Sequence, residues 1–369
     1  MLLEGLHIPL TTPFHPDGRL NLPKLAANVA RYSKTPAAGL IVLGPSGEPT
    51  LLSDDETREV LRTAAEAATP EKVLIAGISR DSVHSTLALA HFAASLGYDA
   101  VLISTPSFLA PESGNSRLDS DMRPIPLSKG HVLERRIFFQ AVADAAPLPV
   151  ILLTEPGRTI VAPMARSMAS HPNIIGLSVD RNSVEIQTGL VRALLQDTAN
   201  QKREVSVTPT FAAVTNRMKT FAQQGSGLVL SAAALTRNSA IAVAEAPAQP
   251  ALRTRTKTIG FQIIASRSTL LLPALNAGAV GIAPAFAAAA PQACYEVYAA
   301  WKDGDAPLAE EKQARLIEAA ALAESLGPAA LKFAADLNGY FGGLPRLPHL
   351  PITGAQRAEL EQLMKPLRN

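Results

Sequence analysis

A turn with the sequence GPSG, at residues 44–47, follows directly after a short apolar run at residues 40–43. The β-branched residues in that run are typical of a strand buried on both faces of a parallel sheet. Glycine in the turn allows unusual backbone angles, and Ser53 and Glu56 have the spacing of a capping box that begins a helix. Such a turn can present backbone N–H groups to a small carboxylate or phosphate. An ordinary connection between a strand and a helix explains the same residues more simply.

Short apolar runs and helix-like segments alternate on either side of this turn. Strands are predicted at residues 7–12, 39–43, 73–78, 100–104, 150–153 and 174–178, and helices at residues 23–32, 54–68, 81–96, 132–145 and 162–170. This alternation with short connections requires a parallel sheet that is covered by helices. Six units, with more downstream, predict the α/β class and a closed (β/α)8 TIM barrel rather than an open sheet.

The alternation is interrupted after the sixth strand, and we expect an insertion there at about residues 197–258. Strand-like runs at residues 205–208 and 228–230 lie inside it and could themselves be barrel strands. Residues 261–265 and 280–282 fit the last two barrel strands better, so the earlier runs are assigned to the insertion.

Helical segments occupy most of the chain after residue 290. The expected organisation is therefore a barrel at residues 1–290, which contains the insertion, and a C-terminal helical region at residues 291–369. Residues 269–295 carry no charge, but prolines interrupt them, so they are interpreted as buried helix and strand rather than a membrane span.

Composition narrows the class of protein. The 369 residues are 47% hydrophobic and 18% charged, which is typical of a globular protein with a large core. A net charge of +2 argues against a nucleic acid or a membrane surface as partner. Cys294 is the single cysteine, and no basic, apolar leader is evident at the start, so we expect a cytoplasmic protein.

Five stretches of the sequence carry a resemblance to a known family. They are PLTTPFHPDGRLN (residues 9–21), GLIVLGPSGEPTLLSDDE (39–56), LPVILLTEPGRT (148–159), the segment from FQIIASRS to WKDGD (261–305) and the tail ALKFAADLNGYFGGLPRLP (330–348). Together they resemble the dihydrodipicolinate synthase/N-acetylneuraminate lyase family, which includes 4-hydroxy-2-oxoglutarate aldolases. The resemblance leaves out residues 110–129 and roughly residues 182–257.

The resemblance implies a fold and a chemistry. It implies a (β/α)8 barrel with C-terminal helices, a homo-oligomer (dimer or tetramer), and a small 2-oxo acid or other carboxylate as ligand, with no cofactor. In this family a lysine amine condenses with pyruvate, and the iminium serves as the electron sink for making or breaking a carbon–carbon bond. A tyrosine moves the protons.

Most of the residues that carry out this chemistry in the family are replaced in this sequence. Ser178 stands at the position of the Schiff-base lysine, and Leu153 stands at the position of the catalytic tyrosine. Pro45 replaces a hydroxyl of the proton relay, and Phe108 replaces a relay tyrosine. Ser46 keeps a hydroxyl that can bind a carboxylate. The catalytic residues are therefore unknown, and the standard Schiff-base mechanism is predicted to be absent.

Two arginines remain candidates for holding the carboxylate of an oxo acid, because a guanidinium binds it with two hydrogen bonds. Arg158 is kept, and Arg267 follows Ser266, which stands where the family has glycine. The substrate-binding residues implied by the resemblance are Gly44, Pro45, Ser46, Gly47, Arg158, Ser178, Ser266 and Arg267.

Two functions stay open. The first is a lyase or aldolase that acts on pyruvate or a related 2-oxo acid by another route. Lys202, Lys219 and Lys257 could supply a replacement amine, although lysines in such a segment are usually solvated. The second is a catalytically inactive family member that binds a small carboxylate in the same pocket.

Metal-dependent aldol chemistry is a lesser variant of the first function. Glu48, Glu155 and Asp180 lie near predicted strand ends, but no histidine cluster with metal-site spacing accompanies them. We therefore expect no metal site and assign these carboxylates to capping or helix pairing.

Overall fold

A computed structural model describes residues 1–109, 129–154, 160, 162–181, 183–225 and 252–367. Eight parallel strands form a closed barrel in the order β1-β10-β9-β6-β5-β4-β3-β2. Their bounds are β1 Gly5–Pro9, β2 Gly39–Val42, β3 Val73–Gly77, β4 Ala100–Ile103, β5 Val150–Leu153, β6 Ile174–Val179, β9 Gln262–Ala265 and β10 Gly281–Ile282. The predicted (β/α)8 barrel is confirmed, and its last two strands are the ones that the sequence favoured.

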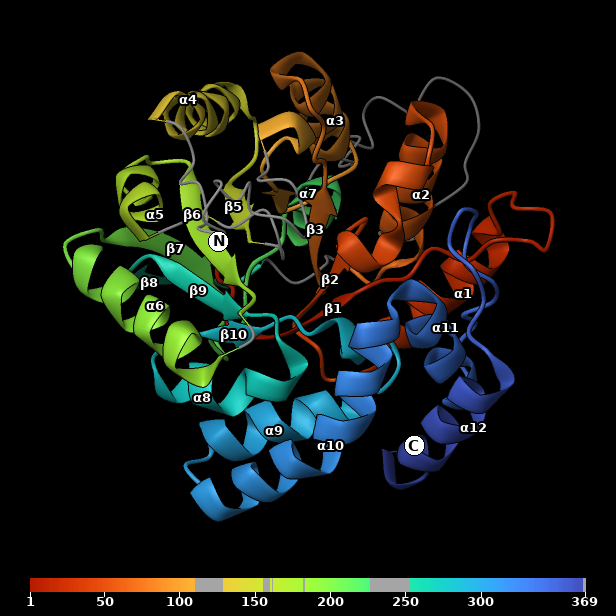
Figure 1. The fold of residues 1–369 in the computed structure, drawn as a ribbon. Helices are drawn as coiled ribbons and strands as arrows, with labels where there is room; N and C mark the ends of the chain where they lie inside the picture. The colour runs from red at the N-terminus through yellow and green to blue at the C-terminus, as the bar shows by residue number, and fades with distance from the viewer. Residues whose placement is uncertain (110–128, 155–159, 161, 182, 226–251, 368–369) are drawn as a thin grey trace, which may run out of the picture.

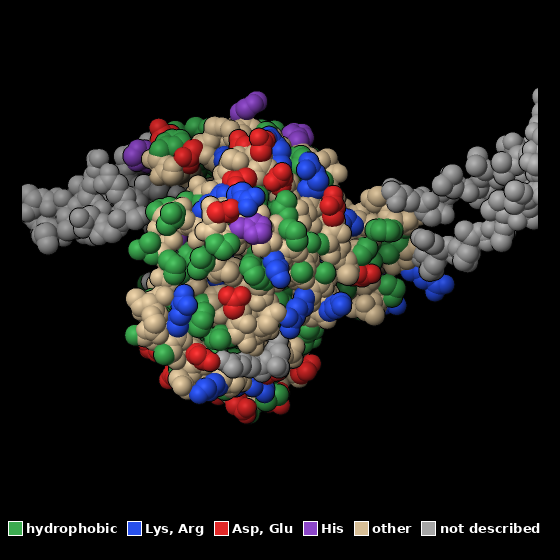
Figure 2. All heavy atoms as spheres, turned by 90° about the vertical axis from the view of Figure 1, so that its right-hand side faces the viewer, with side chains coloured by type: hydrophobic (Ala, Val, Ile, Leu, Met, Phe, Trp, Pro, Cys, Tyr) green, Lys and Arg blue, Asp and Glu red, His purple; other side chains and the backbone are tan. Residues whose placement is uncertain are grey.

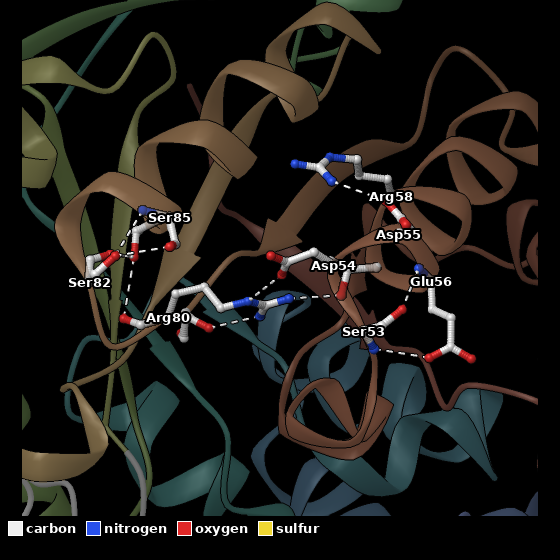
Figure 3. A network of polar contacts seen from close by, with 11 residues as sticks. Ser53, Asp54, Asp55, Glu56, Arg58, Arg80, Ser82 and Ser85 are labelled. Carbon is white, nitrogen blue, oxygen red and sulfur yellow. Dashed lines mark hydrogen bonds and ion pairs between the residues drawn. The ribbon is translucent and has the colours of Figure 1, made fainter.

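Helices surround the barrel in Figure 1. They are α1 Leu22–Ser33, α2 Asp54–Ala67, α3 Val83–Ser95, α4 Lys129–Ala145, α5 Ala162–Ala169, α6 Val184–Asp197 and α8 Leu271–Asn276. The predicted capping box begins α2: the Ser53 amide donates to Glu56 Oε2 (3.0 Å), and the Glu56 amide donates to Ser53 Oγ (3.2 Å), as Figure 3 shows. These two bonds satisfy backbone N–H groups that a helix start leaves without partners.

The strands are buried on both faces. Inward-facing side chains such as Ile75, Leu102 and Ile151 fill the barrel, and alternate residues such as Leu74 and Val101 pack against the helices. A strand with two buried faces reads as a continuous apolar run, which is why the sequence showed these strands so clearly.

His7 is an exception to the apolar filling of the barrel. It is fully buried in β1 and pairs in register with Gly39 on β2, where a Cβ atom would lie 2.6 Å from His7 Nδ1. His7 Nε2 lies 3.2 Å from the Leu3 carbonyl oxygen. Burial lowers the pKa of His7 to about 4, so the imidazole is neutral in the folded protein.

Because of His7, the free energy of unfolding should decrease as the pH is lowered from 6.5 to 4. In that window the unfolded chain binds a proton at His7, whose pKa is then about 6.5, and the folded chain does not. The expected loss is up to about 3 kcal/mol at pH 4, and stability should rise again with pH. Urea unfolding at several pH values measures it. His7→Met should remove this part of the acid sensitivity, whereas the same change at the exposed His84 should not; identical pH profiles for the two variants would refute the argument.

The described part of the expected insertion does not join the barrel. Its strand β7 (Arg203–Val207) pairs antiparallel with β8 (Arg255–Ile259), a strand that the sequence did not predict. Between them lies α7 (Asn216–Gly225), whose first amide donates to Asp99 Oδ1 (2.5 Å) just before β4. Arg217 of α7 donates to the Ala68 carbonyl (2.9 Å) just after α2. The insertion therefore covers the end of the barrel where the strands begin. The predicted run at residues 228–230 lies outside the described residues.

Four helices follow the barrel, as predicted, and are blue in Figure 1: α9 Pro291–Lys302, α10 Ala306–Leu326, α11 Pro328–Leu337 and α12 Gly354–Met364. Gln313 on α10 forms two hydrogen bonds with the segment after β9. Its Oε1 accepts from the Leu272 amide (3.1 Å), and its Nε2 donates to the Ser268 carbonyl (3.0 Å). The C-terminal extension is thereby held against one end of the barrel.

The surface shown in Figure 2 mixes both signs of charge: lysine and arginine side chains are interspersed with aspartate and glutamate. Among the described residues, no helix combines the length and the apolar character that crossing a membrane requires.

Candidate functional site

A cavity of about 250 Å³ opens at the barrel end where the strands finish. We call it the mouth cavity. Leu153 at the end of β5 and Ser178 near the end of β6 are paired in register and both line it. Six of the residues predicted for the site meet in its wall: Pro45, Ser46, Leu153, Ser178, Ser266 and Arg267.

The ends of β6 and its two neighbouring strands are tied together behind Ser178. Thr154 Oγ1 donates to the Ser178 carbonyl (2.8 Å) and accepts from the Asp180 amide (3.0 Å). The Ser266 amide donates to the Val179 carbonyl (2.9 Å). These bonds bring the Ser178 and Ser266 hydroxyl oxygens to 2.6 Å, so one hydroxyl donates to the other. The pair presents hydrogen-bonding groups, and no amine, to the cavity.

Arg267 lies between two carboxylates in the same wall. Its Nε is 2.7 Å from Asp180 Oδ1, and its Nη1 is 3.6 Å from Glu324 Oε2 on α10. The Ser268 hydroxyl also donates to Glu324. Burial raises the pKa of Asp180, against the effect of the Arg267 charge. Burial raises the pKa of Glu324 to about 7, and the charge of Asp180 adds to the rise, while Ser268 and Arg267 oppose it. The Arg267 guanidinium is therefore the positively charged partner of both carboxyl groups.

The GPSG turn is a 3-10 turn, η1 (Pro45–Gly47). Its glycines do not have the unusual angles that their residue type predicts; instead Leu43 (φ 60°) and Glu48 (φ 54°) on either side are left-handed. Leu43 in this conformation brings its carbonyl oxygen against β3, where a Cβ on Gly77 would lie 2.0 Å from it. Strained non-glycine residues of this kind are concentrated at functional sites.

Two amides of this turn are already used. The Gly47 amide donates to the Gly44 carbonyl (2.8 Å), and the Glu48 amide donates to the Pro45 carbonyl (3.4 Å). They are not available to an anion in this conformation. The buried Ser46 is the residue through which the turn offers a hydroxyl to the mouth cavity.

Glu48 is held by a lysine from the C-terminal region. Glu48 Oε1 lies 2.5 Å from Lys332 Nζ on α11, and both side chains have 0% exposure. Glu48 Oε2 accepts from the Arg346 amide (3.0 Å), and Lys332 Nζ donates to the Leu344 carbonyl (3.1 Å). Glu48 thus has the helix-pairing role that the sequence suggested for it.

Other predicted residues lie elsewhere. Arg158 and Glu155 fall outside the described residues. Phe108, in η3 (Ser107–Leu109), is 67% exposed and does not line the mouth cavity. Gly44 lines a separate cavity at the ends of β3 and β4.

The three candidate amines lie at the opposite end of the barrel. Lys257 Nζ pairs with Glu4 just before β1 (2.5 Å), Lys202 precedes β7, and Lys219 is on α7. The barrel strands other than β10 have four to six residues, which separates that end from the mouth by roughly 13–20 Å. Among the residues that the structure describes, no lysine lines the mouth cavity. These three lysines therefore cannot supply an amine to the mouth cavity.

A second cavity of about 320 Å³, the side cavity, adjoins the mouth cavity at the ends of β3 and β4. Arg80 in its wall is held toward α2, with its Nε 3.2 Å from Asp54 Oδ1 and its Nη2 donating to Thr57 Oγ1 at 2.8 Å (Figure 3). Asp81 accepts from the Ser107 amide (2.7 Å) and from its hydroxyl. Arg80, Asp81 and Ser107 of this wall are thus already bound to neighbouring residues.

The sequence profile of the Dihydrodipicolinate synthetase family matches residues 2–117 and 247–367. The chain belongs to this family.

Members of the dihydrodipicolinate synthetase family resemble the chain over different lengths. A 4-hydroxy-tetrahydrodipicolinate synthase from Acidiphilium cryptum (strain JF-5) is 28% identical over 372 residues, which cover 99% of each chain. One from Xanthomonas axonopodis pv. citri (strain 306) is 33% identical over 194 residues, 52% of this chain and 58% of the relative.

Solved structures of dihydrodipicolinate synthetase family proteins share the fold. The chloride-inhibited dihydrodipicolinate synthase from Acinetobacter baumannii, complexed with pyruvate, has a TM-score of 0.72 at 20% identity and covers 99% of this chain and 98% of its own. A prophage protein of the family from E. coli K12, also in complex with pyruvate, has a TM-score of 0.70 at 20% identity, with 100% and 99% covered.

Glu324 lines the mouth cavity of this dihydrodipicolinate synthetase family member and was not predicted from the sequence. It lies on a helix with several other glutamates, and only the Gly327-Pro328 break three residues later distinguishes its place. It contacts Arg267 and Ser268, which lie more than 50 residues earlier in the chain.

Proposed function

We propose that this protein binds pyruvate or another small 2-oxo acid in the mouth cavity without forming a Schiff base. The observation that carries the proposal is the Ser178–Ser266 hydroxyl pair, 2.6 Å apart, at the position that the resemblance assigns to the attacking amine. The pyruvate complexes of two proteins with this fold support the class of ligand.

The groups in the wall suit a small oxo acid. Hydroxyls of Ser46, Ser178 and Ser266 can donate to its carbonyl and carboxylate oxygens. Leu153 and Ile41 supply an apolar surface for its alkyl end. A serine hydroxyl could add to the carbonyl only as a hemiketal, which provides no electron sink for carbon–carbon bond cleavage.

A lyase reaction by another route is the second candidate, and Glu324 favours it. A carboxyl group with a pKa of about 7 in a cavity is suited to act as a general acid or base near neutral pH. The hydroxyl pair would then have to stabilise an enolate in place of an iminium. Release of pyruvate from aldol adducts of 2-oxo acids, followed by a coupled assay, tests for such turnover.

Removing the hydroxyls should weaken ligand binding. Ser178→Ala and Ser266→Ala should each raise the Kd for pyruvate about five- to tenfold, because a neutral hydrogen bond contributes about 1 kcal/mol. Isothermal titration calorimetry measures the change, and Ser325→Ala, on the exposed face of α10, is the matched control. Equal affinities for all three variants, or no binding of pyruvate at millimolar concentration, would contradict the proposal.

A further inference from the structure

Of the described residues that line the mouth cavity, two carry carboxyl groups and one, Arg267, carries a positive charge. Asp180, Arg267 and Glu324 line it together, and Arg267 contacts both of the others. With both carboxyls ionised, this group of three carries one excess negative charge. Glu324, whose side chain is 10% exposed, has little water to screen that charge. These three lining groups would therefore repel an anionic ligand at the Glu324 side of the cavity, because the nearby Arg181 charge acts on Asp180 and is not among the charges that act on Glu324.

Glu324 is the group at which a proton relieves this repulsion most easily. Ser268 from η5 (Ser268–Leu270) donates to it, Arg267 faces it from the end of β9, and Asp180 faces it from the end of β6. The Cys294 thiol of α9 lies behind it, and burial raises the thiol's pKa, so it stays uncharged.

Asp180 is held in its ionised form more firmly than Glu324. It has the closer contact with Arg267, at 2.7 Å against 3.6 Å, and Arg181 adds a second positive charge next to it. Burial brings the pKa of Glu324 to about 7, so protonating this carboxyl costs little free energy near neutral pH.

We propose that Glu324 takes up one proton when the mouth cavity binds a small monocarboxylate, so that the ligand enters as the equivalent of its undissociated acid. The proposal rests on the proposed function and adds a residue and a specificity to it. The protonated Glu324 carboxyl can donate a hydrogen bond to the ligand, while Asp180 keeps Arg267 neutralised. A dicarboxylate would bring a second charge with no second proton to balance it, so monocarboxylates are the selected class.

Calorimetry of pyruvate binding in buffers with different ionisation enthalpies counts the protons. The expected uptake is about nine tenths of a proton per pyruvate at pH 8 and about one tenth at pH 6. The Kd should rise about tenfold per pH unit above pH 7. Malonate, a dicarboxylate of similar size, should bind at least tenfold more weakly than pyruvate at pH 8.

Glu324→Gln should still bind pyruvate, because the amide resembles the protonated carboxyl, but its proton uptake and pH dependence should disappear. Glu318→Gln, on an exposed position of the same helix, should behave as the unaltered protein. Circular dichroism at each pH verifies the fold of the variants, and the proton count on the unaltered protein needs no variant.

The outcomes separate the two proposals. Pyruvate binding with a constant Kd and no proton uptake overturns the role of Glu324 and leaves the proposed function standing. A pH dependence that persists in Glu324→Gln shows that another group takes the proton and overturns the assignment. Absence of pyruvate binding from pH 6 to pH 8 overturns both.

Discussion

Replacing Lys332 by methionine is expected to lower the free energy of unfolding by about 3–5 kcal/mol, because the change leaves a buried carboxylate without its cation. Lys332 and Glu48 are both fully buried and 2.5 Å apart. Methionine fills a similar volume, so lost packing adds little. Urea unfolding should show a lower midpoint with an unchanged slope.

A surface pair on the neighbouring helix provides the control. Lys312 lies 3.3 Å from Glu296, and both side chains are partly exposed, so Lys312→Met should cost less than about 1 kcal/mol. Combining Glu48→Gln with Lys332→Met should recover part of the loss, since neither partner then carries an uncompensated charge. A loss at Lys332 no larger than that at Lys312 would refute the importance of the buried pair.

The Lys332 pair also explains why the GPSG turn has a shape that its residue types did not predict. Glu48 adopts a left-handed angle while its side chain is held by α11, almost 300 residues later in the chain. Local preference assigned the unusual angles to the glycines, and tertiary contacts placed them at Leu43 and Glu48 instead. A contact of this range leaves no local pattern in the sequence.

Elements whose stability is local were predictable. The Ser53–Glu56 capping box and the buried strands at the barrel core have signals within a few residues, and the structure contains them. Strand β8 was missed because its alternating polar residues, such as Arg255 and Lys257, match a surface loop equally well. It becomes a strand by pairing with β7 beneath the barrel.

The residues of the candidate site likewise include some that the sequence could place and others that it could not. Leu153, Ser178 and Ser266 could be placed together because each ends a strand, and the ends of parallel strands in a barrel meet at one mouth. The contact of Arg267 with Glu324 could not be foreseen, because Glu324 comes from the C-terminal helices. Those contacts change Arg267 from a free ligand for carboxylates into a partner of two acidic side chains.

The absence of a Schiff base is the largest functional effect that we expect. A Schiff base needs a primary amine. None of the described lysines lines the mouth cavity, and Lys332 on α11 is buried in its ion pair with Glu48. Ser178→Lys would restore an amine, yet it should not restore full aldolase turnover, because Leu153 lacks the hydroxyl that moves protons. Robust turnover by that single variant would refute the argument about the proton relay.

Treatment with pyruvate and sodium borohydride, followed by mass spectrometry of the intact chain and its peptides, shows whether any lysine of this protein forms a Schiff base. Borohydride reduces an iminium to a stable amine, and a lysine-bearing member of the family serves as the positive control. We expect no pyruvate-dependent mass increase on this chain. A pyruvate-dependent adduct on Lys332, or on any other lysine at the mouth of the barrel, would show that a Schiff base forms and would identify the replacement amine.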